Sequence, residues 1–316
     1  MLKLSSKDFI EIRQWMYRNA RHLELVQWQY EFENGRKEAI LEAMLFYQNE
    51  DGGFGNGFEP DNWNPNSTPY MTMFAIDILK NIGATDVNHL VLSGILRFLD
   101  SGTHFTEKGW DWSIPTNDEY PHAPWWNYDP EHSVQEFGLS AEIASFILQV
   151  CEKNSSLYNK GITVAKYIIE RLKISIECNA EGGNVTGANM LLEALQKLDL
   201  LGELNGEFLP EAVKKMISSA IVTDSSKWEE YGGRPLGFIE TPNSVYYNEY
   251  KDIVQKELDY LIESRSKQGV WGLTWTWFDN IEKYEKAWAI SENWWKCLVA
   301  IGNLRYLKNF DRLEII

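Results

Sequence analysis

The sequence predicts an all-α fold that closes into a ring of helical hairpins. An amphipathic helix, a glycine-rich loop and a largely apolar helix recur several times along the 316 residues. Stacked hairpins form either an open solenoid or a closed ring. The second helix of each pair is too apolar for an exposed solenoid face, and the units are few, so we expect the ring. We find no strand-rich block and no linker, which predicts one domain over residues 1–316.

Periodicity and end signals predict the helices of the first half of the chain. They are expected over residues 5–33, 36–48, 69–82 and 88–99. Ser67 or Thr68 can cap the third of these, and Pro69 suits its first turn. This helix is apolar almost all round, so we expect burial on most sides.

The second half of the chain repeats the pattern. Helices are expected over residues 137–150, 158–174, 188–201, 210–220, 248–265 and 284–307. Ser133 and Glu136 have the spacing of a capping box before the first of them. Further glycine pairs stand at 182–183 and 232–233. Residues 270–277 alternate in polarity and predict an extended loop with its tryptophans on one side.

Charge and cysteine content restrict the possible partners and compartment. The formal charge of −16 argues against nucleic acid or an anionic membrane as a partner. No run is apolar enough to span a bilayer, and the N-terminus lacks the apolar core of a signal peptide. The three cysteines are isolated and lack metal-ligand spacing. We therefore expect a cytoplasmic protein that has neither a metal nor another cofactor.

Two segments carry a family resemblance. Gln48-x-x-x-Gly52-Gly53-Phe54 and Gln268-Gly269-Val270-Trp271 resemble the Gln-Trp repeats of squalene and hopene cyclases and of protein prenyltransferase β-subunits. Residues 48–69 and 121–126 are also similar to uncharacterised bacterial proteins described as prenyltransferase-like. The resemblance implies an α/α toroid whose end loops frame a central pocket. The acidic motifs of terpenoid cyclases and the zinc ligands of prenyltransferases are missing.

The glycine-rich loop carries the first candidate site residues. Glu59 and Asp61 follow the glycines and precede a helix start, and carboxylates this close can divide acid and base roles. Alternatively, both hold the loop by accepting backbone N–H bonds, or they pair with arginine. Phe54 is a candidate substrate contact.

The aromatic loop over residues 110–132 is the second candidate. Histidine can titrate near neutral pH, so His122 is a candidate catalytic group, and Asp129 is a second candidate in the same loop. Its aromatic side chains suit sugar stacking or a cationic transition state. The candidate contacts are Trp110, Trp112, Trp125 and Trp126. Alternatively, these tryptophans form a satellite core that seals one end of the fold.

Four acids stand inside the apolar helices: Asp77, Glu142, Glu193 and Glu292. Facing inward they would form a ring of carboxylates with raised pKa values, whereas facing between helices they would bond to backbone or indole groups. Glu292, close to three tryptophans, is the best catalytic candidate of the four. Trp271 and Trp275 are candidate substrate contacts.

Three functions fit these features. The first is an enzyme related to terpenoid cyclases or prenyltransferases that uses acids in an aromatic pocket on an isoprenoid substrate. The second is a carbohydrate-active enzyme, a hydrolase or lyase, whose paired carboxylates are Glu59 or Asp61 with Asp129 or Glu131. The third is a toroid that binds a small ligand without catalysis. We expect the first, with a pocket formed by the loops at 51–68, 110–132 and 270–280.

Overall fold

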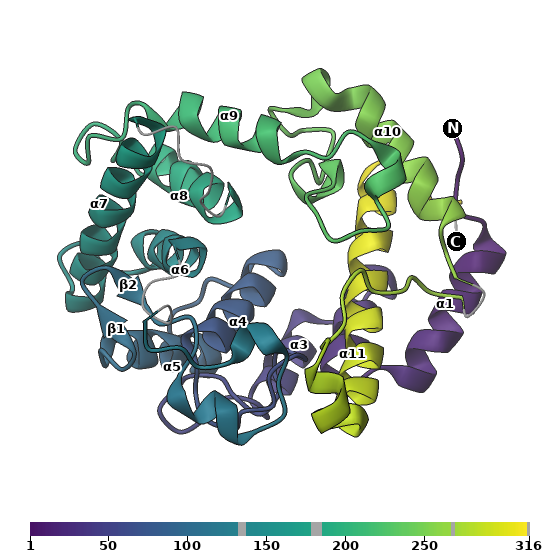
Figure 1. Cartoon of the computed structure of the whole chain (residues 1–316), viewed down its shortest axis with the longest axis horizontal. Helices are drawn as coiled ribbons and strands as arrows, with labels where there is room; N and C mark the ends of the chain where they lie inside the picture. Colours follow the sequence, from purple (N-terminus) through teal and green to yellow (C-terminus); the bar gives the residue numbers. More distant parts are fainter. Residues whose placement is uncertain (132–136, 178–184, 267–268, 315–316) are drawn as a thin grey trace. The chain divides into compact units, whose positions relative to one another are not determined.

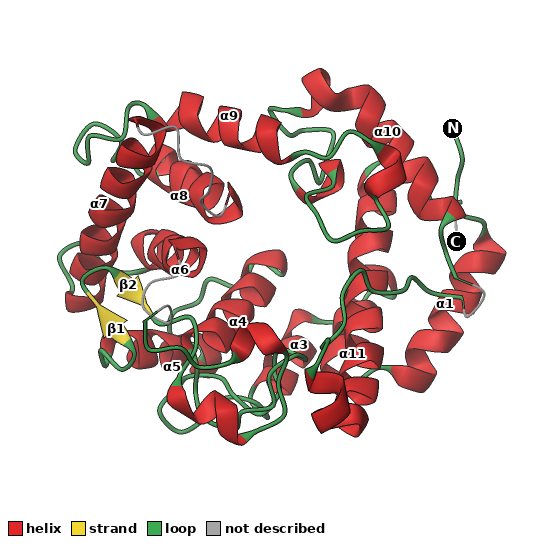
Figure 2. Ribbon diagram, in the orientation of Figure 1, coloured by secondary structure: helices red, strands yellow, loops and turns green. Residues whose placement is uncertain are grey.

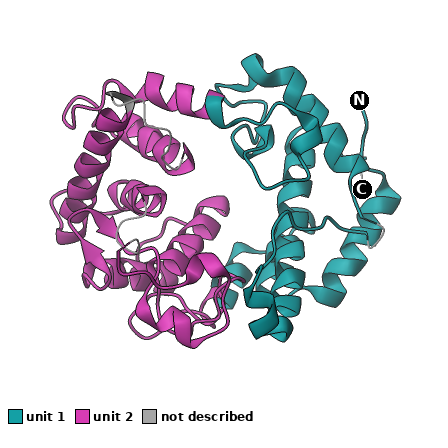
Figure 3. Cartoon of the chain, viewed as in Figure 1, with its two compact units in different colours: residues 1–43, 219–316 teal, residues 44–218 magenta. Residues whose placement is uncertain are grey.

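The computed structural model describes residues 1–131, 137–177, 185–266 and 269–314. These residues form eleven α-helices, four short 3₁₀ helices and one antiparallel pair of two-residue strands (Figures 1 and 2). The all-α class that the sequence predicts is confirmed. The chain divides into two compact units (Figure 3): unit 1 contains residues 1–43 and 219–316, and unit 2 contains residues 44–218. A single domain over residues 1–316 stays a prediction.

Unit 1 is built around the long helix α11, which packs against α1, α2 and α10. Its helices are α1 (Ser6–Asn19), α2 (His22–Phe32), α3 (Lys37–Met44), α10 (Tyr247–Glu263) and α11 (Asn280–Asn309), with the 3₁₀ helices η3 (Ser225–Lys227) and η4 (Pro235–Gly237). The last residue of α3 belongs to unit 2. Residues 270–277 lack regular secondary structure, as predicted. Between Trp271 and Trp277 the odd-numbered positions are buried or half-buried and the even-numbered positions are exposed.

The expected single helix over residues 5–33 is wrong, because the chain breaks between α1 and α2. Ser5 caps α1, its hydroxyl accepting the Asp8 N–H at 3.1 Å. Ala20 and Arg21 are extended. The Arg21 guanidinium turns back onto Glu24, with 2.5 Å between Nη2 and Oε1, and the two side chains are 8% and 0% exposed. This buried ion pair fixes the start of α2, and neither glycine nor proline marks the break in the sequence.

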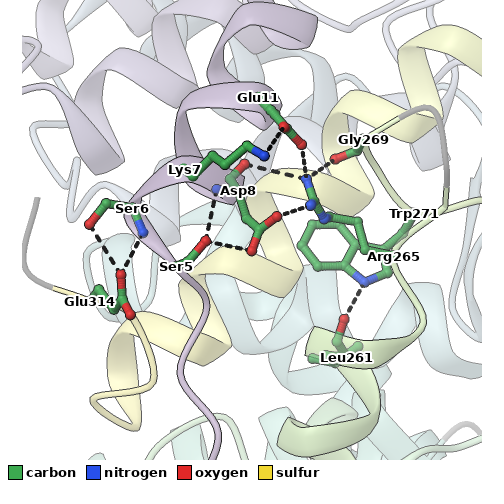
Figure 4. A network of polar contacts seen from close by, with 10 residues as sticks. All are labelled: Ser5, Ser6, Lys7, Asp8, Glu11, Leu261, Arg265, Gly269, Trp271 and Glu314. Atoms are coloured by element: carbon green, nitrogen blue, oxygen red, sulfur yellow. Dashed lines mark hydrogen bonds and ion pairs between the residues drawn. The ribbon is translucent and has the colours of Figure 1, made fainter.

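A polar network joins the two ends of the chain in unit 1 (Figure 4). Leu4 and Leu313 form a parallel bridge, and Glu314 accepts the Ser6 N–H at 2.8 Å. Arg265 binds the Asp8 carboxylate and the Gly269 carbonyl, the latter at 3.2 Å. The network anchors the beginning of α1 against the segment that follows α10.

Unit 2 is centred on α6, which packs against α7 and α8 and contacts α4. Its elements are α4 (Pro69–Asn81), α5 (Leu90–Asp100), β1 (Phe105–Thr106), β2 (Gly109–Trp110), η1 (Pro115–Glu119), η2 (Pro124–Trp126), α6 (Phe137–Val150), α7 (Ser156–Glu177), α8 (Val185–Lys197) and α9 (Leu209–Ala220), the last two residues of α9 belonging to unit 1. The helix expected over 36–48 is shorter, because α3 already ends at Met44. The predicted capping box at 133–136, the glycine pair at 182–183 and Gln268 lie outside the described residues.

Gln48 explains the spacing of the glycine-rich motif. Its side-chain amide donates to the carbonyls of Gly52 and Val91, both at 2.9 Å, and so fixes the loop to the start of α5. Gly52 has φ +95°, and a Cβ there would come within 2.1 Å of the Gly94 carbonyl oxygen. Only glycine fits this close approach of two backbones.

Helix α4 begins and packs as predicted. The Thr68 hydroxyl accepts the Met71 N–H at 3.0 Å, and Pro69 occupies the first turn. Thr68 also donates its own N–H to the Phe54 carbonyl at 3.0 Å. The loop therefore runs straight into the buried helix, which positions the residues considered next.

Candidate functional site

The two loops that the sequence singles out pair with each other in unit 2. The Ala123 N–H donates to the Asp61 carbonyl at 2.8 Å, and the Trp63 N–H donates to the Pro121 carbonyl at 2.9 Å. Asn62 and His122 form an antiparallel bridge between these two bonds. Backbone pairing therefore brings Glu59 and Asp61 into one region with His122, although about 60 residues separate them in the sequence.

Three buried asparagines hold this region together. Asn117 accepts hydrogen bonds from the side-chain amides of Asn62 at 3.2 Å and Asn64 at 2.8 Å. Its own amide donates to the Trp126 carbonyl at 3.1 Å. All three side chains are nearly completely buried, so each hydrogen bond replaces one lost to water. Sequence reasoning missed Asn117, because a single asparagine in a loop carries no distinguishing signal.

Glu59 and Asp61 lie inside the paired loops. Glu59 is 2% exposed and Asp61 is 1% exposed. The Glu59 carboxylate accepts the Asp61 N–H at 3.0 Å. The bond supports the alternative interpretation of Glu59, in which its carboxylate holds the loop by accepting a backbone N–H.

His122 presents both ring nitrogens to oxygen atoms. Nδ1 lies 2.6 Å from the Tyr120 carbonyl oxygen, and Nε2 lies 2.8 Å from the Asn127 side-chain oxygen. Asp118 is 3.8 Å from Nε2. Both ring nitrogens therefore lie within hydrogen-bonding distance of an oxygen atom, and these contacts hold the ring inside the loop.

Next to the polar region lies an aromatic cluster formed by Tyr70, Trp112 and Trp126. The two indoles stack with 4.6 Å between centroids, and the Tyr70 ring lies 4.8 Å and 4.3 Å from them. Trp112 donates its indole N–H to the Trp125 carbonyl at 3.0 Å. Trp126 is buried, while Trp112 and Trp125 are half-buried. Two of the four predicted tryptophan contacts of this loop, Trp112 and Trp126, therefore come together.

The other aromatic candidates of unit 2 are core residues. Trp110 and Phe54 are both 0% exposed. Phe54 packs on Phe58, whose ring lies 4.6 Å away. The Trp110 backbone N–H donates to the Ser140 hydroxyl at 3.0 Å, which ties β2 to α6. Among the described residues, neither Trp110 nor Trp126 has a hydrogen-bond partner for its indole N–H.

Helix α4 has one face that reaches solvent, and that face carries an acid. Tyr70, Phe74 and Asp77 are half-buried at a spacing of four and then three residues, whereas the other residues from Pro69 to Leu79 are buried. Phe74 extends the aromatic cluster toward Phe58, at 5.9 Å. The acid of this face stands directly beyond the aromatic side chains along the helix.

Asp77 is both accessible to water and surrounded by protein. Its side chain is 37% exposed, and Lys80 Nζ lies 3.4 Å from its carboxylate. Burial among the surrounding atoms raises the pKa of the Asp77 carboxyl, and the Lys80 charge opposes this shift. The sequence signal was present, since Asp77 is the only charge in α4 before Lys80. Glu142, by contrast, is 7% exposed, and Glu193 is exposed.

The remaining candidates lie elsewhere. Asp129 is exposed and accepts the Glu131 N–H at 2.8 Å. Glu292, Trp271 and Trp275 belong to unit 1. The Trp271 indole donates to the Leu261 carbonyl at 2.8 Å, and the residue is only 4% exposed, so it anchors its loop to α10 (Figure 4).

Unit 1 contains a perturbed acid that sequence reasoning missed. Glu257 on α10 is 1% exposed, and its carboxylate accepts the Leu236 N–H at 2.7 Å. Arg234 Nε lies 3.3 Å away. Burial raises the pKa of Glu257 to about 7, against the opposing effects of the Leu236 bond and the Arg234 charge. In the sequence, Glu257 sits among other charges of an amphipathic helix, so nothing distinguishes it from an exposed acid.

The described part of the chain contains no cluster of three or more histidine, cysteine, aspartate or glutamate side chains that could hold a metal ion. Over the same ranges, none of the helices combines the length and apolarity needed to cross a membrane. Comparison with protein-family models, with curated proteins and with solved structures gives no match.

Proposed function

We propose that the chain is an enzyme that acts on a small isoprenoid substrate by acid catalysis, with Asp77 as the proton donor. One observation carries this proposal: the only face of α4 that reaches solvent combines two aromatic residues with one carboxyl whose pKa burial raises. A raised pKa keeps a larger fraction of the carboxyl protonated near neutral pH, as a proton donor requires.

The chemistry follows from these groups. Asp77 gives its proton to one carbon of a double bond, and the π electrons form the new C–H bond. The neighbouring carbon becomes a carbocation, and Asp77 becomes a carboxylate. The faces of Tyr70 and Trp112 stabilise the positive charge. Loss of a proton from an adjacent carbon to the Asp77 carboxylate then forms a new double bond and restores the acid.

Glu59, Asp61 and His122 have supporting parts in this proposal. Their burial inside the paired loops favours a role in holding the aromatic cluster rather than contact with substrate. The carbohydrate-active alternative needs two carboxylates that reach a sugar. That alternative pairs Glu59 or Asp61 with Asp129 or Glu131, and Glu59 and Asp61 are almost completely buried. Since one member of each pair is buried in this way, the acid on α4 supports the isoprenoid reaction better.

For the fold, the proposal is the α/α toroid that the Gln-Trp-type repeats imply. The protein is proposed to be cytoplasmic and to use no cofactor. The helical hairpins and the contact of Gln48 with the glycine-rich loop support it. A crystal structure of the full chain tests it, because a toroid requires the hairpins to close on themselves.

A carbocation mimic tests the reaction. Geranyldimethylamine is protonated at neutral pH and combines an isoprenoid tail with a positive charge. We expect it to bind the wild type in an isothermal titration and to bind D77N about tenfold more weakly, the loss of one close charge contact. The control is E193Q, which removes an exposed acid of α8 in the same unit. Equal affinity for wild type and D77N, or no binding to the wild type, overturns the proposal.

A further inference from the structure

Helix α11 in unit 1 presents an acid between two tryptophans. Trp288, Glu292 and Trp295 are spaced by four and then three residues, so their side chains share one face of the helix. All three are half-buried. This face therefore combines two indoles with a carboxylate that water can reach.

The extended segment before α11 adds a third ring. Trp275 is half-buried and lies edge-on to Trp295, with 5.2 Å between centroids and 85° between planes. Trp275 also meets the Tyr231 ring, with 6.4 Å between centroids and 84° between planes. Tyr231 is 82% exposed. Both neighbours thus hold the Trp275 ring at right angles, which fixes its orientation at the surface.

The polar groups of this face supply both an acceptor and a donor. Glu292 pairs with Lys296 at 2.8 Å, and the side chains are 37% and 14% exposed. The carboxylate retains lone pairs beyond the one used, and an ammonium has three donors. The pair can therefore bind hydroxyl groups without losing its own contact.

We propose that Trp275, Trp295, Glu292 and Lys296 form a saccharide-binding site in unit 1. A pyranose ring presents apolar C–H faces that pack on an indole and hydroxyls that bond to charged side chains at its edge. The pairing of Glu292 with Lys296 disfavours a cationic ligand, because the carboxylate is already neutralised. It also disfavours a purely apolar ligand, which would bury the ion pair without new hydrogen bonds.

This site is independent of the proposed reaction, since all of its residues lie in unit 1 and those of the reaction lie in unit 2. D77N is therefore expected to bind saccharide as the wild type does. Failure of one proposal leaves the other in place.

The test is a titration of the full chain with maltotriose, cellotriose and chitotriose. Binding is monitored by saturation-transfer NMR and by tryptophan fluorescence. We expect at least one trisaccharide to bind, and W275A and E292Q to weaken it about tenfold each, as expected for loss of a packed ring or a charged hydrogen bond. W275Y keeps an aromatic platform and should retain most of the affinity. The control is E282Q, an exposed acid in the first turn of α11.

Three results overturn the proposal. The first is no binding of any of the three sugars to the wild type. The second is W275A with wild-type affinity while its thermal unfolding shows it to be folded. The third is saturable binding of tetramethylammonium, sensitive to E292Q, in the absence of sugar binding, which would assign the face to cations.

Discussion

The carboxylate of Glu257 accepts the backbone N–H of Leu236 at 2.7 Å in the interior of unit 1, which joins α10 to the first residues of η4. Burial raises the pKa of this carboxyl to about 7 from its ordinary value of 4.5. The folded state therefore binds the proton more tightly than the unfolded chain does.

This linkage predicts a pH dependence of stability. The stabilisation that comes from proton binding to Glu257 is fully present below pH 4.5 and is lost as the pH rises through 7. The free energy of unfolding changes by on the order of 3 kcal/mol over this range. E257Q removes the titration and should flatten the curve over this range. Urea unfolding of both proteins between pH 4 and pH 8 measures it. E263Q, an exposed acid of the same helix, should leave the slope unchanged. An unaltered slope in E257Q would contradict the assignment.

The close approach of Gly52 and Gly94 predicts that G52A is strongly destabilising. The methyl group would meet the Gly94 carbonyl oxygen at 2.1 Å, and φ +95° is strained for alanine. Backbone atoms cannot move aside as a side chain can, so we expect a loss of roughly 3 kcal/mol or more in the free energy of unfolding. Thermal and urea unfolding measure it.

Gly83 provides the matched control for that substitution. It also has positive φ, at +62°, but a Cβ there meets nothing within 4 Å. G83A should therefore cost only about 1 kcal/mol, the conformational term alone. Similar losses in the two variants would show that the contact with Gly94 does not matter.

The helices were largely predictable because each has a local signal. Ser5 and Thr68 cap as their positions suggest, and the apolar pattern of α4 correctly indicates burial. The break between α1 and α2 was not predictable, since the ion pair of Arg21 with Glu24 that defines it looks like any surface pair in the sequence.

The candidate site was predictable only in part, for the same reason. The loops at 51–68 and 110–132 were identified by composition, but their pairing depends on backbone bonds such as that from Ala123 to Asp61. Asp77 was visible as an isolated charge, whereas its accessibility depends on which face of α4 its neighbours cover. Asn117 and Glu257 act through tertiary contacts alone, so no local pattern could indicate them.

The three hydrogen bonds of Asn117 predict that N117A loosens the aromatic cluster. The substitution leaves the amides of Asn62 and Asn64 and the carbonyl of Trp126 buried without this partner. We expect a loss of about 2–4 kcal/mol in the free energy of unfolding, together with a weaker near-ultraviolet circular dichroism signal from the stacked indoles. N81A, at an exposed position of α4, is the control. Preserved stability and dichroism in N117A would contradict this role.

The half-buried thiol of Cys151 should react slowly. Burial and the nearby Asp100 charge raise its pKa to about 11, and burial raises the pKa of the fully buried Cys297 further. At pH 8 only about 0.1% of a thiol with that pKa is thiolate, the reactive form. In a C178S background, iodoacetamide alkylation of Cys151, followed by mass spectrometry, should accelerate about tenfold per pH unit from 8 to 10, while Cys297 stays unmodified. Unfolding in urea should make both react at equal, ordinary rates. Rapid labelling of Cys151 in the folded protein at pH 8 would show that its thiol is neither desolvated nor influenced by Asp100.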